Sequence, residues 1–356
     1  MKKYYLGIDV SKNDLTYCLA KDQNETVMTG EIDNDSKTIS TFLKNVLKKN
    51  NISKEQLVVG AEYTGIYSNL LASVCATEGY KLWLEDPAKM KNGFYEKREK
   101  TDKLDARRIA EYIWRYSDKT RLYVPRQETI QLLKDLLRTL ASLRKDLATY
   151  EMQLGEEKKF SPAKSYAART EILAQVNEAL KNAIMDTEKR IAEAISSDPG
   201  LNEIDMRIRS IPGVGPVTSH VMICVTEGFT KFDDSRPFLR YSGMAPQLYD
   251  SGTSVHKRPK TSKACCHLIK QTLYMPSLAF CSNGGKRGKE DTELLDFYKR
   301  KKEGQGKHHC NVQNVIMAKI VRRIFAVVKE GREYLPTDEY NRTYHPERMK
   351  RTEGDK

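Results

Sequence analysis

Four acidic residues in the first third of the chain have a setting that surface acids rarely have. Asp9 and Glu62 each interrupt an apolar run typical of a buried strand, where a carboxylate is costly unless it is paired or binds a metal. Asp102 and Asp105 are three residues apart in a helical pattern, so both face the same way. Mg²⁺ prefers carboxylate oxygens, and two such ions can hold both oxygens of a phosphoryl displacement. The four acids therefore predict a divalent-metal site that acts on phosphate.

The elements that would position these acids follow from the spacing of the apolar residues. Three strands are expected first, and helices then alternate with two further strands. The expected strands are residues 3–9, 14–20, 26–32, 57–62 and 80–84, and the expected helices are residues 37–49, 66–78 and 100–114. This order predicts an RNase H-like α/β domain over residues 1–125, with one acid in the first strand and another at the end of the fourth.

The segment after Pro125 has a different pattern. Apolar positions from Leu133 to Leu154 alternate spacings of three and four residues, and a second stretch from Leu173 to Ala194 continues this seven-residue repeat. Residues 155–170 between them are polar and contain Pro162, so the two helices are expected either to fold back on each other or to be joined by a mobile loop. Residues 126–200 therefore predict either a helical hairpin within one chain or a coiled coil that joins two chains.

Residues 201–335 predict a mainly helical third domain, followed by a polar, basic tail over residues 336–356. A Pro-Gly-Val-Gly-Pro turn separates two apolar helices in this domain, as in a helix-hairpin-helix. Its Gly213 and Gly215 would let backbone amides approach a nucleic-acid phosphate without reading bases. A turn of this kind is also common where two helices simply pack together.

A glycine-containing turn in the third domain carries Ser251, just ahead of a basic run. A serine hydroxyl is a weak nucleophile without a base or a metal, and the sequence shows no His/Asp pair beside Ser251. Alone, Ser251 is typical of a turn residue. We expect the basic run to contact nucleic acid, and its members are Lys257, Arg258, Lys260 and Lys263.

The charge of the chain favours a polyanionic partner. The net charge is +13, and the segment from Ser251 to Lys356 holds 23 Lys/Arg against 12 Asp/Glu, which favours nucleic acid. The seven cysteines are odd in number and scattered, so we expect reduced core residues rather than disulfides or zinc ligands. Charged residues begin at Lys2 and no apolar run could span a bilayer, so we expect a cytoplasmic protein.

Five sequence blocks stand out along the chain. They are GIDVSK (7–12), GAEYTGIY (60–67), KTDKLDA (100–106), SIPGVGP (210–216) and MAPQLYDSG (244–252). Together these blocks resemble the IS-one-ten family of insertion-sequence transposases. The resemblance extends in the family's order from about residue 4 to about residue 330. One departure is Asp86-Pro87, where relatives often have Asn-Pro.

The resemblance implies a RuvC-like domain and a separate serine-bearing domain. Ser251 matches the family's catalytic serine, and the nearby Thr253 and Ser254 stay alternatives for the nucleophile. The implied function is a DNA recombinase that mobilises an insertion element through a transient serine–DNA link. The implied acidic tetrad, which holds Mg²⁺ or alternatively Mn²⁺, is Asp9, Glu62, Asp102 and Asp105.

The family also implies partners. These are donor and target double-stranded DNA and a structured bridge RNA that pairs with both, so that sequence choice is made largely by the RNA. A homodimer that assembles into a tetramer is expected to use the coiled coil. The expected location is the nucleoid of a prokaryotic cell.

Three alternative functions are consistent with the same residues. A RuvC-like junction resolvase or nuclease would need the tetrad but would use metal-activated water instead of Ser251, so it would form no SDS-stable protein–DNA adduct. A site-specific DNA invertase would share the domain pair and differ mainly in its substrates. A non-catalytic nucleic-acid-binding scaffold would be unaffected by Asp102→Ala together with Asp105→Ala.

Overall fold

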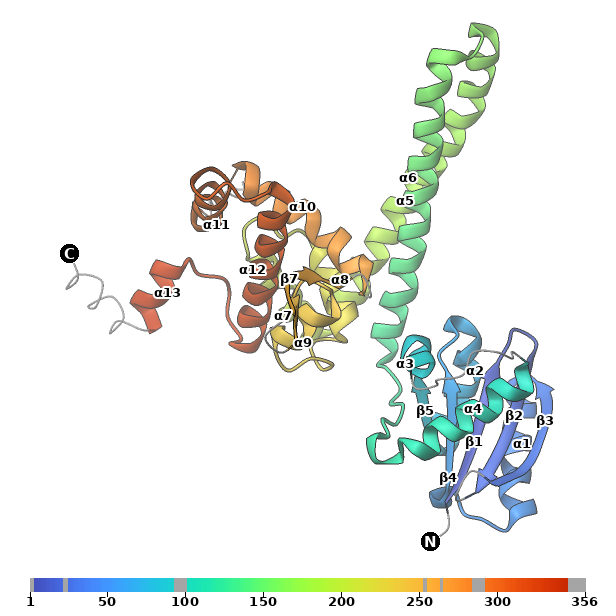
Figure 1. Ribbon diagram of the computed structural model, residues 1–356. Helices are drawn as coiled ribbons and strands as arrows, with labels where there is room; N and C mark the ends of the chain where they lie inside the picture. The colour runs from blue at the N-terminus through green and yellow to red at the C-terminus, as the bar shows by residue number, and fades with distance from the viewer. Residues whose placement is uncertain are drawn as a thin grey trace. The chain divides into compact units, whose positions relative to one another are not determined.

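The computed structural model describes residues 3–21, 25–92, 101–251, 255–262, 265–283 and 292–344. The chain divides into two compact units, Met1–Pro125 (unit 1) and Arg126–Lys356 (unit 2) (Figure 1). Within the described ranges, no helix combines the length and the apolar character needed to cross a bilayer.

Unit 1 is built on a five-stranded mixed sheet with the strand order β3-β2-β1-β4-β5. The first three strands pair antiparallel in sequence, while β1 pairs parallel with β4 and β4 with β5. The predicted order of the five strands and of three helices is confirmed, with boundaries that differ by three residues at most, while helix α3 was not predicted. The strands are β1 (Tyr4–Val10), β2 (Asp14–Lys21), β3 (Glu25–Asp33), β4 (Leu57–Glu62) and β5 (Lys81–Glu85), and the helices are α1 (Ser36–Asn50), α2 (Asn69–Glu78), α3 (Pro87–Asn92) and α4 (Asp102–Arg115).

The two faces of the sheet are covered by different helices (Figure 1). Leu6, Ile8 and Val10 of β1 are buried in one apolar cluster with residues of α1 and α2. Tyr5, one residue out of step with them, is buried in another cluster with residues of α4. Successive side chains of a strand point to opposite faces, so Asp9 belongs to the face that α4 covers.

Helix α4 lies directly on β1 because a glycine leaves room for it. A Cβ atom on Gly7 would lie 2.2 Å from the carbonyl oxygen of Ala106 and 2.3 Å from the amide nitrogen of Ala110. On β4, a Cβ atom on Gly60, which pairs with Gly7, would lie 2.6 Å from a side-chain carbon of Ile113. Small buried side chains form a cluster at this contact, namely Cys18, Ala20, Ala106 and Ala110.

Gly7→Ala is therefore expected to lower the free energy of unfolding of unit 1 by about 1–3 kcal/mol, because the backbone of α4 must move away from the strand. Urea unfolding of the full chain, followed by tryptophan fluorescence, measures this change through Trp83, which packs near α4. Gly60→Ala is the matched comparison and is expected to cost less, since a side chain and not a backbone must give way. Equal stability of the wild type and Gly7→Ala would contradict the direct contact.

Unit 2 begins with a long helical hairpin. Helices α5 (Glu128–Phe160) and α6 (Ala163–Ser196) pack against each other, with a turn at Ser161 and Pro162. The two helices fold back on each other, which is one of the two expectations for residues 155–170, and most of that segment is helical rather than a mobile loop. Glutamates and lysines favour helix up to Phe160, and Pro162, at the N-cap of α6, interrupts the helix only briefly.

Ion pairs between the two helices support the hairpin. Lys181 lies 3.3 Å from Glu151, and Arg169 lies 2.6 Å from Glu157, in each case between α6 and α5. The heptad pattern is therefore satisfied within one chain, and a coiled coil between two chains stays a prediction.

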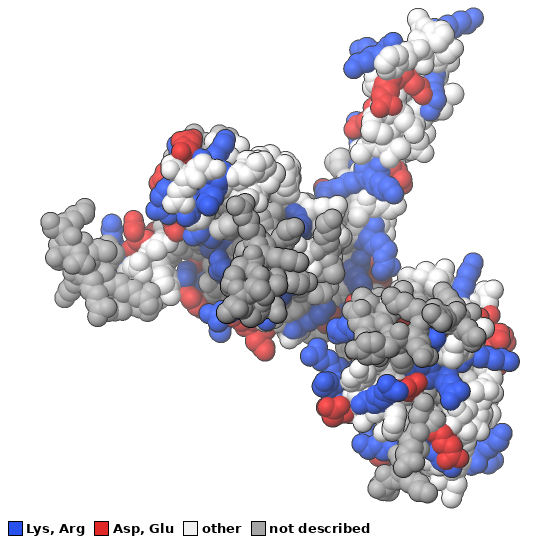
Figure 2. Space-filling view, in the orientation of Figure 1, with Lys and Arg blue, Asp and Glu red and all other residues white. Residues whose placement is uncertain are grey.

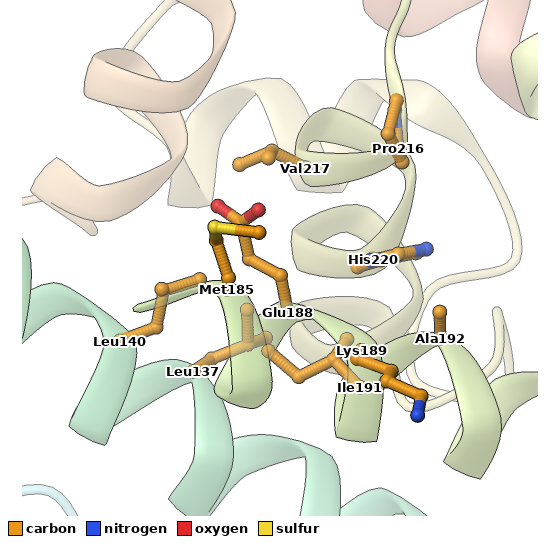
Figure 3. Close-up of a pocket in the computed structure, with 10 residues that line it drawn as sticks. All are labelled: Leu137, Leu140, Met185, Glu188, Lys189, Ile191, Ala192, Pro216, Val217 and His220. Carbon is orange, nitrogen blue, oxygen red and sulfur yellow. The ribbon is translucent and has the colours of Figure 1, made fainter. Parts of the chain in front are cut away.

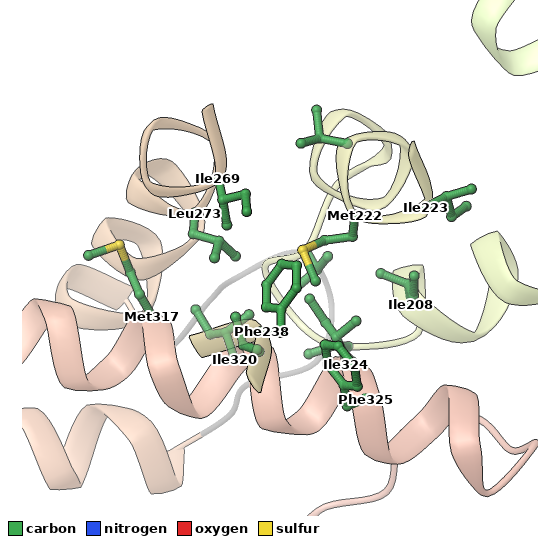
Figure 4. Packing of buried hydrophobic residues seen from close by; sticks show 14 of the residues in the cluster. Ile208, Met222, Ile223, Phe238, Ile269, Leu273, Met317, Ile320, Ile324 and Phe325 are labelled. Carbon is green, nitrogen blue, oxygen red and sulfur yellow. The ribbon is translucent and has the colours of Figure 1, made fainter. Parts of the chain in front are cut away.

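The rest of unit 2 is mainly helical, as predicted, and has one large apolar core. Phe238 is fully buried at the centre of this core, with its ring centroid 5.3 Å from that of Phe325 (Figure 4). The described part of the tail contains a helix, α13. The elements are α7 (Pro199–Arg209), α8 (Pro216–Thr226), α9 (Ser235–Tyr241), β6 (Pro246–Ser251), β7 (Val255–Thr261), α10 (His267–Asn283), α11 (Thr292–Lys299), η5 (Arg300–Gly304), α12 (His309–Lys329) and α13 (Thr337–Tyr344).

Candidate active site

The first two predicted acids lie side by side at one edge of the sheet. The parallel register pairs Ile8 with Ala61, so the next residues, Asp9 and Glu62, are neighbours on strands about 4.8 Å apart. Glu62 is in step with Gly60, which contacts α4, so both acids belong to the face that α4 covers. Both side chains are half-buried, which leaves the carboxylates accessible to an ion.

The other two acids occupy the first turn of α4. Thr101 caps this helix, since its hydroxyl oxygen accepts a hydrogen bond from the Leu104 amide at 3.3 Å. Asp102 is exposed, while Asp105 is half-buried and accepts a hydrogen bond from Arg108 at 3.1 Å. Acids in a first helical turn are also stabilised by the helix dipole, so these two carboxylates have a structural role besides any chemical one.

The contact between Gly7 and α4 brings the two pairs of acids into one region. Asp9 is two residues beyond Gly7, and Asp105 directly precedes Ala106, whose carbonyl lies against Gly7. Even so, among the described residues no three Asp, Glu, His or Cys side chains are grouped closely enough to form a metal site. The fold therefore gathers four carboxylates without closing them around an ion. Their hard oxygen donors fit a divalent cation such as Mg²⁺.

Glu85 is a fifth carboxylate at this edge, which the sequence did not lead us to predict. It pairs with Glu62 in the parallel register and is only 7% exposed. Its Oε1 accepts hydrogen bonds from the Asp86 amide and from Lys89 Nζ, both at 3.0 Å, and its Oε2 accepts one from Trp83 at 3.2 Å. The one available signal was an acid that ends an apolar strand just before Asp86-Pro87.

The partners of Glu85 keep it ionised and tie three elements together. Burial acts to raise the pKa of the Glu85 carboxyl, but the hydrogen bonds from Asp86 and Lys89 outweigh burial and hold this pKa below its usual value. Glu85 also hydrogen-bonds Tyr112 of α4. Glu85 thus links β5 to α3 and α4, and Lys89 offsets its charge beside Glu62.

Glu85→Gln is expected to lower the free energy of unfolding at pH 7 by about 1–3 kcal/mol, because a buried, charge-assisted set of hydrogen bonds is lost. The lowered pKa means that Glu85 stabilises the fold above its ordinary pKa of 4.5 and loses this effect as the pH falls below that value. The difference between wild type and variant should therefore narrow in urea titrations near pH 3.5. Glu31→Gln, at an exposed position of β3, is the control and should change stability by less than about 0.5 kcal/mol.

Ser251 ends β6 in a two-stranded antiparallel hairpin with β7. The register pairs Ser251 with Val255 and Tyr249 with Lys257, so the hairpin brings the backbone of the basic run beside that of the serine strand. Arg258 and Lys260 also belong to β7. The remaining predicted positions, Thr253, Ser254 and Lys263, lie outside the described residues.

The predicted Pro-Gly-Val-Gly-Pro turn lies between α7 and α8, as expected. Gly213 has a φ of +74°, which favours glycine, and a Cβ atom on Gly215 would meet no atom within 4 Å. On its other side, α8 begins against the helical hairpin across a cavity of about 340 Å³ (Figure 3), which His220 also lines. The turn is thus accessible beside Gly215 and supported from behind, and its contact with nucleic acid stays a prediction.

A buried polar pair holds the two helices of this turn together, and it was not predicted. Asp205 of α7 lies 3.6 Å from the His220 ring of α8 and accepts a hydrogen bond from Arg209 at 3.2 Å. Burial lowers the pKa of His220, although the nearby Asp205 opposes this shift. The sequence shows His220 only as a lone histidine in an apolar helix, and this pattern does not indicate Asp205 as its partner.

Exposed basic residues occur at the end of α11 and in the following η5 of unit 2. Figure 2 shows Lys and Arg side chains over this part of the molecule, together with Asp and Glu side chains, and Lys299, Arg300 and Lys302 are exposed there. Such a patch attracts a polyanion. Its position in the last third of the chain agrees with the charge distribution of the sequence.

Two family models match this chain in order. One, for the DEDD transposases of IS110, is described as "Transposase" and matches residues 6–156. The other is described as "Transposase IS116/IS110/IS902 family" and matches residues 205–291. Together they cover about two-thirds of the chain.

Individual relatives and one solved structure are also similar to the chain. The pilin gene-inverting proteins of Moraxella lacunata and Moraxella bovis are each 25% identical over 339 residues, 94% of this chain and 98% of the relative. An insertion element IS110 protein of Streptomyces coelicolor is 25% identical over 127 residues, 36% of this chain and 29% of that protein. The T. thermophilus RuvC structure with a Holliday junction substrate covers 34% of this chain and 99% of its own, at 12% identity and a TM-score of 0.26.

The two family models match residues in both units. The first spans the four acids, and the second spans the turn with Gly213 and Gly215 as well as Ser251. Because both models describe transposases of one group and match in the expected order, the chain belongs to the IS110 (IS-one-ten) family of transposases, which are enzymes that act on DNA.

Proposed function

We propose that this transposase is a divalent-metal-dependent recombinase with Ser251 as its nucleophile and a tetrad of metal-binding carboxylates, Asp9, Glu62, Asp102 and Asp105. One observation carries the proposal. The β1–β4 register and the contact of Gly7 with α4 gather all four acids in one region of unit 1, in a protein with a net charge of +13. Concentrated negative charge in a DNA-acting enzyme is best explained by a cation that binds there.

The proposed reaction exchanges one phosphate ester bond for another, so that no phosphodiester is hydrolysed. Ser251 Oγ attacks a backbone phosphate and forms a serine–phosphate bond, while the bond from phosphorus to one sugar oxygen breaks and that oxygen leaves as a hydroxyl. The serine proton passes to a carboxylate or to water, which returns a proton to the leaving sugar oxygen. Attack by the hydroxyl of a second strand then reverses these bond changes and releases Ser251. A divalent ion, when bound, activates the hydroxyl and neutralises charge on the phosphate.

We propose Mg²⁺ as the ion, with Mn²⁺ as a substitute. The tetrad offers only carboxylate oxygens, which suit hard cations, and the family's four-carboxylate type suggests divalent-metal dependence in general. Asp105 would have to exchange its hydrogen bond with Arg108 for the ion, or share its two oxygens between them.

We propose that a structured bridge RNA directs this enzyme to its donor and target DNA. The excess of Lys and Arg after Ser251 supports a second polyanionic partner. In such a division of labour, the protein holds nucleic-acid backbones through groups such as the amides near Gly213 and Gly215, while base pairing selects the sequence.

We propose that two chains associate through the α5–α6 hairpin, and that the dimers assemble into tetramers. Exposed apolar side chains on the hairpin support this arrangement, because such residues favour a partner surface. These side chains are Met152, Phe160, Ile172 and Met185, which are 60%, 84%, 66% and 67% exposed.

A site-specific DNA invertase is the second candidate. The two Moraxella relatives are named pilin gene-inverting proteins and match nearly the full length of this chain. Inversion and transposition can share the same bond changes and differ in how the two DNA sites are arranged. A plasmid with two sites in inverted orientation would give inversion as the main product if this candidate is right.

An in vitro recombination reaction tests the proposed function. Purified full-length protein is combined with Mg²⁺, donor DNA, target DNA and the RNA transcribed from the sequence that flanks the gene. Joined donor–target products that depend on the RNA are expected. Nicked, unjoined products without a covalent protein–DNA adduct would favour the junction resolvase, and unchanged activity of Asp102→Ala/Asp105→Ala would favour a non-catalytic scaffold.

A further inference from the structure

A cavity of about 580 Å³ in unit 2 is not used by the chemistry proposed above. It is lined by residues of α10 and α12 and by Pro246 and Thr261, the two ends of the β6–β7 hairpin. Its volume is within the range of about 300–1,000 Å³ that is typical of ligand pockets. The cavity thus lies at the root of the hairpin whose tip region carries Ser251.

Two cations line this cavity without an acidic partner among the described residues. Lys270 comes from α10 and Arg322 from α12, and neither forms a salt bridge within the described part of the chain. The adjacent Arg323, in contrast, is bound to Glu293 at 2.9 Å. Two cations on one cavity that no described acid neutralises favour an anionic occupant such as a phosphate group.

Other side chains of the cavity suit a nucleobase. Tyr274 is 47% exposed and offers a ring on which a base can stack. Gln313 is only 3% exposed, and its Nε2 donates to Ser277 Oγ at 3.1 Å, while no described residue donates to its Oε1. Asn311 lines the same cavity and is exposed. Amide groups of this kind hydrogen-bond the edges of bases.

A hydrogen bond also links a residue of the cavity to the segment just ahead of the strand that carries the serine. Asn314 of α12 lines it and donates a hydrogen bond at 3.2 Å to the carbonyl oxygen of Met244, just ahead of β6. From Pro246 to Ser251 an extended strand covers about 17 Å, at about 3.3 Å per residue. One strand of a DNA duplex advances about 3.4 Å per nucleotide, so this span corresponds to about five nucleotides.

We propose that this cavity binds a nucleotide of the DNA strand that is cut, about five positions from the attacked phosphate. Lys270 and Arg322 hold its phosphate, Tyr274 stacks on its base, and Gln313 accepts a hydrogen bond from the base edge. The choice of DNA rests on the proposed function, because the hairpin must meet the strand that Ser251 attacks. Binding there would fix the position of that DNA strand along β6.

Cys310 is a natural probe of the cavity, since it lines it and is exposed, whereas Cys18, Cys75 and Cys281 are buried. The full chain is treated with a maleimide in EDTA, with or without a single-stranded DNA of about 12 nucleotides. Peptide mass spectrometry follows the modification of Cys310. We expect the DNA to slow this modification about fivefold or more, as base stacking and phosphate contact close the cavity.

Variants of the cavity test whether the protection of Cys310 comes from DNA bound in the cavity. With Lys270→Gln/Arg322→Gln, protection by DNA should fall below about twofold. Lys329→Gln, at the exposed end of α12, removes a similar charge and should keep full protection. Fluorescence anisotropy confirms for each variant that DNA is bound at the concentration used, and circular dichroism confirms the fold.

Three results would overturn the proposal. They are unchanged Cys310 reactivity when DNA is bound, equal protection in wild type and double variant, or protection by RNA, deoxyadenosine monophosphate or an acidic peptide but not by DNA. The assay measures binding and not cutting. Adduct formation by Ser251→Ala would refute the proposed function and leave Cys310 protection intact, while loss of protection alone would refute only this inference.

Discussion

Ser251→Ala is expected to reduce strand exchange by at least about 10⁴-fold, because removal of a nucleophile leaves only binding and electrostatic contributions. The covalent protein–DNA adduct should disappear together with the recombined product. DNA binding should be unchanged, since the substitution removes one hydroxyl oxygen at the end of β6. Denaturing gel electrophoresis of labelled DNA measures the adduct and the product in the same reaction.

Ser254→Ala is the matched control, because it removes the same group three residues further along. It should keep adduct formation close to the wild-type level, and Thr253→Ala should behave in the same way. If Ser254→Ala loses the adduct while Ser251→Ala keeps it, the nucleophile has been assigned to the wrong residue. If all three variants keep the adduct, the hairpin does not supply the nucleophile.

Asp9→Asn is expected to reduce DNA cleavage about 10²- to 10³-fold, because it removes the charge that would help to hold a divalent ion while it keeps the size of the side chain. Glu62, at the neighbouring register position, should show an effect of similar size when changed to Gln. The measurement is the single-turnover rate of strand cleavage over a range of Mg²⁺ concentrations. A partial recovery at high Mg²⁺ would indicate weakened ion binding.

Asp118→Asn is the control for this prediction, since Asp118 is an exposed acid of unit 1 that does not belong to the tetrad. It should leave the cleavage rate and its Mg²⁺ dependence unchanged. Full activity of Asp9→Asn at every Mg²⁺ concentration would contradict a catalytic role of the tetrad.

The sheet of unit 1 could be predicted because its information is local. Alternating apolar residues such as Leu6, Ile8 and Val10 define a strand and the face it buries, and the element order then limits the topology. The setting of Asp9 and Glu62 within such strands also marked them as unusual. Their adjacency, however, depends on the pairing of β1 with β4, which only the structure supplies.

Features that depend on tertiary partners could not be predicted. Glu85 differs from an ordinary strand-end acid through its hydrogen-bonding partners, one of which, Tyr112, the fold brings to it from α4. The role of Gly7 likewise depends on the backbone of α4, which is about 100 residues away in the sequence. Of the two expectations for residues 155–170, the mobile loop is not realised, because the residues of this polar stretch favour helix.

The central claim is that a tetrad-dependent attack by Ser251 links the enzyme to DNA. Isolation of the DNA-linked peptide from a reaction with Mg²⁺, followed by mass spectrometry, tests this claim most directly. The account predicts a nucleotide attached to Ser251 in the wild type, and no such peptide in EDTA or from Asp9→Asn. A nucleotide on another residue, or a Ser251 adduct of equal yield without metal or without Asp9, would contradict it.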